Sequence, residues 1–94
     1  MAKETDLAAA KKVARDNLET LRIYLVHCVD EGMLDSDDEF YNKTLGLIDD
    51  TSVLTTWDEL AELIDRAKVL EQDIDVWLSL HGRTSLSLLW PTVE

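Results

Sequence analysis

Cysteine, proline and glycine are all scarce in this chain of 94 residues, which has one cysteine, one proline and three glycines. The single cysteine, Cys28, excludes an internal disulfide and a metal site built from several cysteines. Glycine and proline favour tight turns and interrupt helices, so a chain with so few of them should have few tight turns and few helix breaks. The composition therefore favours a few long helices joined by short connections.

Long apolar runs are also missing. No stretch approaches the ~20 apolar residues of a membrane-spanning helix, and residues 1–6 lack the apolar core of a secretion signal. The sequence therefore predicts a cytoplasmic protein without membrane contact. A hydrophobic content of 46% is high enough for a folded core, so we expect one helical domain over residues 1–94.

Basic residues are outnumbered by acidic ones, nine to twenty, which gives a net charge of −11. Residues 1–22 carry five basic and four acidic side chains, or +1, and residues 23–94 carry four and sixteen, or −12. The electrostatic field of this negative charge repels nucleic acid and attracts basic proteins. We expect no nucleic-acid partner and a possible basic protein partner.

The first predicted helix covers about residues 6–31. Its apolar residues recur three or four positions apart, which places them on one face of a helix. This seam consists of Leu7, Ala10, Ala14, Leu18, Leu21, Leu25 and Cys28. Thr5 or Asp6 can cap the start, and Gly32 can end the helix in a left-handed conformation.

A second long helix is predicted over about residues 57–80. Thr56 and Glu59 form a capping box at its start, and Gly82 follows its end. Its seam consists of Leu60, Leu63, Ala67, Leu70, Ile74 and Trp77. Glu62 and Arg66, four residues apart, can pair on the outside.

A short helix is predicted between them, over about residues 37–48, with Ser36 and Glu39 as its capping box. Residues 49–54 are expected to form a connection. The acidic residues before this helix do not fit a calcium loop that starts at Asp35. The sixth position, Phe40, would have to be glycine, and the twelfth, Gly46, would have to be glutamate. Residues 83–94 are expected to form an apolar docking tail around Trp90, either as a short helix capped by Ser85 or as an extended strip, and Pro91 ends whatever structure precedes it.

These elements predict an all-α fold. It is a small bundle of two long antiparallel helices with a short helix between them and an apolar C-terminal tail. Apolar residues lie outside both seams, including Ile64 and Leu78 on the last helix, and a second copy would cover them. We therefore expect a homodimer. Its predicted interface consists of Ile23, Tyr24, Val26, His27, Val29, Val69, Val76, Leu88 and Trp90.

Arg22 and His27 fit a pattern of arginine, four residues and histidine, which resembles the catalytic motif of HEPN-type ribonucleases. The resemblance covers six residues and implies RNA cleavage at a site formed by two subunits. Five positions on one helix place the two side chains about 140° apart, so they share no face within one chain. His27 and His81 could hold zinc only if the ends of the two long helices met. We predict no catalytic site, no metal site and no cofactor.

The predicted function is that of a non-catalytic protein–protein interaction module, an adaptor or regulator that acts as a helical homodimer. The alternative is an acidic inhibitor, either an immunity-type protein or a nucleic-acid mimic, that binds a basic enzyme surface. Steep salt dependence of binding would favour this alternative.

Overall fold

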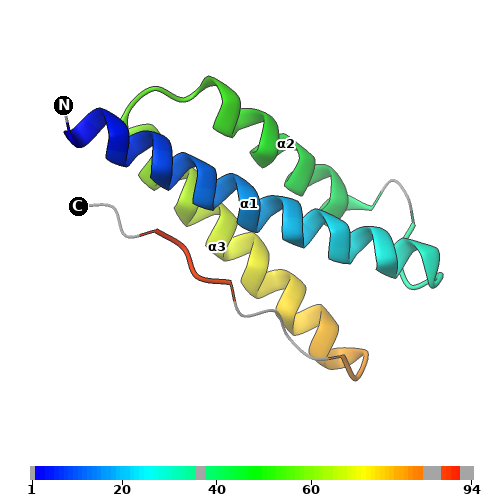
Figure 1. Ribbon diagram of the computed structural model, residues 1–94. Coiled ribbons are helices and arrows are strands. Elements are labelled where there is room, and N and C mark those ends of the chain that lie inside the picture. The colour runs from blue at the N-terminus through cyan, green and yellow to red at the C-terminus, as the bar shows by residue number, and fades with distance from the viewer. Residues whose placement is uncertain (1, 36–37, 84–87, 92–94) are drawn as a thin grey trace.

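The described part of the chain forms three helices, α1 (Ala2–Asp30), α2 (Glu39–Val53) and α3 (Trp57–Leu80), which Figure 1 shows. The computed structural model describes residues 2–35, 38–83 and 88–91, and this part of the chain contains no strand. The all-helical fold expected from the seams is therefore confirmed. The molecule is elongated, with extents of 47 × 21 × 16 Å.

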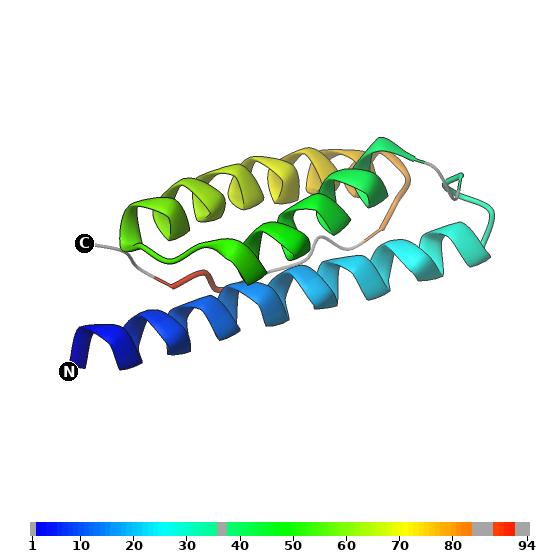
Figure 2. The same cartoon turned by 90° about the horizontal axis from the view of Figure 1, so that it is seen from above.

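The two long helices run in the same direction, which corrects the predicted antiparallel arrangement. In Figures 1 and 2, α2 returns along α1, and α3 then runs again in the direction of α1. An ion pair between Glu31 and Arg83 accordingly joins the ends of α1 and α3. Phe40 at the start of α2 contacts Trp77 near the end of α3, with ring centroids 6.3 Å apart. The prediction failed because α2 is long enough to make a complete return pass.

The core lies between the three helices and uses both predicted seams. Its buried apolar residues are Ala10, Ala14, Leu18, Leu21, Leu25, Cys28, Leu34, Leu47, Ile48, Leu54, Leu60, Leu63, Ile64, Ala67, Leu70, Ile74 and Leu78. Ile64 and Leu78 were expected to be surplus, yet they are 3% and 0% exposed. Because α3 contacts both α1 and α2, its buried face is wider than one seam.

Helix α2 differs most from its predicted bounds of 37–48. Its N-cap is Asp38, whose Oδ1 accepts a hydrogen bond from the Phe40 N–H at 2.8 Å. The predicted cap, Ser36, lies outside the described residues. The helix continues to Val53, where the sequence predicted a connection. Thr51 and Leu54 are buried, so tertiary packing extends the helix beyond the acidic pair that follows Ile48.

Helix α1 begins at Ala2, so it runs through Thr5 and Asp6, which were predicted to cap its start near residue 6. The end of α1 and both ends of α3 follow the sequence signals. Gly32 has φ +78°, and the Met33 N–H donates to the Cys28 carbonyl at 2.9 Å, as in a Schellman motif. Thr56 caps α3, since its hydroxyl oxygen accepts a hydrogen bond from the Glu59 N–H at 3.2 Å. The observed bounds of α3 match the predicted 57–80.

Residues 88–91 have no regular secondary structure and bridge α1 and α3. The Asn17 amide donates to the Leu89 carbonyl at 2.6 Å. The Glu71 carboxylate accepts from the Leu88 N–H at 3.2 Å and from the Trp90 indole N–H at 3.3 Å. Leu88 and Trp90 pack against the core. This segment therefore covers part of the surface that the three helices leave open.

Candidate functional site

The chain covers part of the predicted interface by itself. Of the nine residues, Tyr24, Val29, Leu88 and Trp90 are half-buried against the core, and Val26 is also half-buried. Ile23, His27, Val69 and Val76 remain exposed. The chain therefore leaves less apolar surface uncovered than the sequence analysis expected.

The exposed members of this set belong to two helices rather than to one patch. Ile23 and His27 lie on α1, whereas Val69 and Val76 lie on α3. Leu80, which the prediction missed, is 80% exposed, against 58% for Val69 and 62% for Val76. Offsets of seven and eleven residues from Val69 keep Val76 and Leu80 on the same side of a helix. We call these three residues the α3 stripe.

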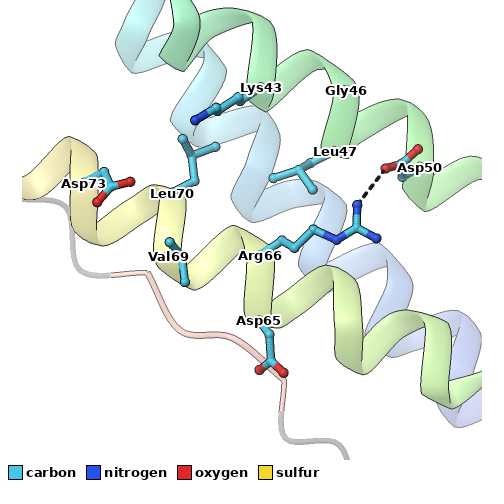
Figure 3. Close-up of a pocket in the computed structure, with 9 residues that line it drawn as sticks. All are labelled: Lys43, Gly46, Leu47, Asp50, Asp65, Arg66, Val69, Leu70 and Asp73. Atoms are coloured by element: carbon cyan, nitrogen blue, oxygen red, sulfur yellow. Dashed lines mark ion pairs between the residues drawn. The ribbon is translucent and has the colours of Figure 1, made fainter.

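An open groove of about 560 Å³ lies between α2 and α3 (Figure 3). Its floor is formed by Leu47 and Leu70, which are 7% and 4% exposed and whose side chains point into the space between the helices. Val69 of the α3 stripe forms part of its outer edge, so the groove and the stripe are continuous. An apolar floor that is open to solvent can accept an apolar side chain of a partner.

Gly46 opens the α2 side of this groove. A Cβ added there would meet nothing within 4 Å, so no close backbone contact requires a glycine. A glycine inside a helix costs about 1 kcal/mol relative to alanine. The groove does not follow from the sequence, because it depends on which α3 residues lie opposite Gly46. The only sequence signal was an unfavourable glycine within an otherwise regular helix.

Both cations at the groove are already paired with carboxylates. Arg66 lies 2.9 Å from Glu62 and 3.7 Å from Asp50, measured from guanidinium nitrogen to carboxylate oxygen. Lys43 Nζ lies 2.7 Å from a Glu39 oxygen. The hydrogen bond and charge of Glu39 raise the pKa of Lys43, and the charge of Asp73 raises it further. In return, Lys43 lowers the pKa of Glu39.

Two further carboxylates, Asp65 and Asp73, complete the groove lining. Within the described part of the chain, neither lies within ion-pairing distance of a cation. With Lys43, Asp50 and Arg66, the lining carries two positive and three negative charges, or −1. Adding Glu39 and Glu62, the partners of the two cations, gives −3. The groove is therefore apolar at its floor and negative around it.

A smaller depression of about 440 Å³ contains the main basic residues, Lys11, Lys12 and Arg15. Lys11 Nζ donates to the Leu54 carbonyl at 2.9 Å and thereby binds the C-terminal end of α2. Lys12 Nζ lies 3.1 Å from an Asp16 oxygen. Two of the three cations thus have structural partners, which leaves little charge for an anionic ligand.

The residues of the ribonuclease-like pattern have separate environments. Arg22 Nε donates to Glu19 at 2.9 Å, and this hydrogen bond raises the pKa of the arginine. His27 is exposed. The ends of α1 and α3 do approach each other, but the His81 ring lies against Trp77, with centroids 4.4 Å apart. Among the described residues, no group of three histidine, cysteine or acidic side chains could hold a metal ion.

Comparison of the chain with known protein families, with curated proteins and with solved structures found no match. In the described residues, no helix combines the length and apolar character needed to cross a bilayer.

Proposed function

We propose that this protein is a non-catalytic protein-binding module that acts as an adaptor or regulator. The observation that carries the proposal is the surface formed by the α2–α3 groove and the α3 stripe. It combines a buried leucine floor with three exposed apolar side chains on one side of α3. Contiguous exposed apolar surface with a polar rim is typical of sites where proteins bind one another.

The same surface supports a second candidate function, that of an acidic inhibitor of a basic enzyme. The specific observation is the carboxylate excess around the groove, where neither Asp65 nor Asp73 lies within ion-pairing distance of a cation among the described residues. The two functions differ in salt dependence. Charge-driven association weakens steeply as salt screens it, whereas apolar contacts persist.

The homodimer remains part of the proposal in a reduced form. Exposed apolar residues on α1, Val13 and Ile23, and the α3 stripe are the surfaces that a second copy could cover. Two chains that each carry a net charge of −11 repel each other, so a dimer would need contacts away from the acidic groove.

The test is a capture experiment that compares two double variants of equal charge. Val69→Asp/Val76→Asp places two carboxylates on the α3 stripe, and Val13→Asp/Ile23→Asp places two on α1. All four positions are more than 40% exposed in the wild type, so both variants should fold. We expect a partner captured from a native extract by the wild-type protein to be lost with the α3 variant and kept with the α1 variant. Equal capture by both variants would refute the assignment of this surface.

A further inference from the structure

Building on the proposed protein-binding function, we propose a specific occupant for the α2–α3 groove. It is an amphipathic helix of a partner protein that carries lysine or arginine beside its apolar face. Its apolar side chains lie on Leu47 and Leu70 next to Gly46, and its cations pair with Asp65 and Asp73.

The shape of the groove fits a helix better than a small molecule. Its volume of about 560 Å³ is within the range of ligand pockets, but it is open along one side and continues into the α3 stripe. Small-molecule sites enclose most of the ligand surface. A helix laid in an apolar groove instead inserts side chains spaced three, four and seven residues apart. The exposed Val69 and Val76, seven residues apart, offer contacts of matching period.

The charges select a basic partner over a second copy of this chain or a nucleic acid. Lys43 and Arg66 are paired with Glu39, Glu62 and Asp50, so the groove has carboxylates in excess. A second copy carries a net charge of −11 and would meet this excess with like charge. Phosphate groups would be repelled in the same way. Lysine or arginine on the docked helix would compensate the excess instead.

The spacing of Asp65 and Asp73 sets the spacing of the basic residues on the docked helix. Asp65 and Asp73 are eight residues apart on α3, which corresponds to about 12 Å along the helix axis. A helix lying along α3 can reach both carboxylates with cations seven or eight residues apart. Its apolar residues would then occupy the two turns between these cations, over Val69 at the edge of the groove.

Gly46 lines the α2 side of the groove. A Cβ built at this position meets nothing within 4 Å, so a larger side chain has room there at the α2 edge of the groove. Leucine is a far better helix former than glycine, so Gly46→Leu should fill the groove without unfolding the protein. This variant changes no charge, which separates the effect of shape from that of electrostatics.

The experiment is isothermal titration calorimetry of the full chain with two synthetic helical peptides. Both carry leucines on one face. One has lysines eight residues apart beside that face, and the other has glutamates there. We expect the lysine peptide to bind and the glutamate peptide not to bind. Gly46→Leu should lower the affinity for the lysine peptide at least tenfold. Removing two surface ion pairs lowers an affinity by about fivefold. Asp65→Asn/Asp73→Asn should therefore weaken binding of the lysine peptide by about this factor.

A matched control removes the same charge elsewhere. Asp6→Asn/Asp30→Asn changes two exposed carboxylates of α1, and we expect the affinity to stay within twofold of the wild type. Absence of binding, unchanged binding by Gly46→Leu, or equal weakening by the two asparagine pairs would each overturn the proposed occupant. These outcomes leave the capture experiment intact, because that experiment tests the α3 stripe with the natural partner. Far-ultraviolet circular dichroism of each variant confirms folding.

Discussion

Gly46 and Gly32 show how differently one residue type can act at two positions. Gly46 lies inside α2 with helical neighbours and open space around its Cβ position, whereas Gly32 ends α1 with φ +78°. A left-handed conformation costs an L-residue with a side chain about 1–2 kcal/mol. Gly32 is therefore explained by backbone geometry, and Gly46 is not.

The two alanine variants should consequently have opposite effects. We expect Gly46→Ala to raise the free energy of unfolding by up to about 1 kcal/mol, because alanine loses less conformational entropy in a helix. Gly32→Ala should lower it by about 1 kcal/mol through left-handed strain. Urea denaturation followed by circular dichroism measures both. Destabilisation by Gly46→Ala would show that the position is more crowded than the structure indicates.

The Cys28 thiol should be unreactive in the folded protein. Its side chain is 4% exposed, and burial raises its pKa above the usual 9.0, with opposing smaller effects from Arg83 and Glu31. Less thiolate is therefore present at pH 8 than in the unfolded chain. We expect Ellman's reagent to react slowly with the native protein, faster as pH rises, and at once in urea. Equally fast reaction with and without urea at pH 8 would contradict the burial of this thiol.

At the scale of elements, Glu71 connects α3 to the segment of residues 88–91. Its two carboxylate oxygens accept hydrogen bonds from the Leu88 N–H and the Trp90 indole N–H. From α1, the Asn17 amide also donates a hydrogen bond to this segment, at the Leu89 carbonyl. Glu71 is thus the main polar group that holds this segment on α3.

Replacing Glu71 with alanine should release the segment while the three helices stay folded. We expect a loss of about 1–2 kcal/mol, as for removal of two partly exposed hydrogen bonds to a charged group. The Leu88 amide should exchange faster with deuterium, and the Trp90 indole resonance should shift toward its solvent-exposed position. Glu62→Ala, on the same helix but paired with Arg66, is the control. Unchanged exchange at Leu88 in Glu71→Ala would contradict the role given to this carboxylate.

The sequence predicted the helices well where packing and local signals agree. The seams of α1 and α3, the Thr56 cap and the Gly32 terminus follow from periodicity and capping chemistry alone. The end of α2 was wrong because Asp49, Asp50 and Thr51 have weak helix propensity, and tertiary burial of Thr51 and Leu54 overrides it. The relative direction of α1 and α3 was then predicted wrongly, because the length of α2 had been underestimated.

At the scale of the molecule, the candidate site could not be predicted from the sequence. Val69 and Val76 were identified as surplus to the seam, but Tyr24, Val29, Leu88 and Trp90 pack on their own chain. The groove needs α2 and α3 side by side, with Gly46 near Leu70. Periodicity assigns residues to a face of one helix, and it does not say which faces of two helices meet.

Oligomeric state tests how much apolar surface the single chain leaves uncovered. If copies cover the exposed residues of α1 or the α3 stripe, size-exclusion chromatography with light scattering should give twice the chain mass of 10.7 kDa. We expect this dimer at micromolar concentration. Because the negative charge around the two grooves keeps them apart, the dimer should form through α1, and Val13→Asp/Ile23→Asp should dissociate it. A mass of 10.7 kDa for the wild type would refute the homodimer and leave the groove open to a different protein.

Nuclear magnetic resonance of the ¹⁵N-labelled protein, titrated with the lysine peptide, tests most directly whether the protein binds partners through its α2–α3 surface. We expect the largest chemical-shift changes on the amides of Gly46, Leu47, Val69 and Leu70, with little change along the outer side of α1. Changes centred on α1, or spread evenly over all acidic positions, would contradict this expectation.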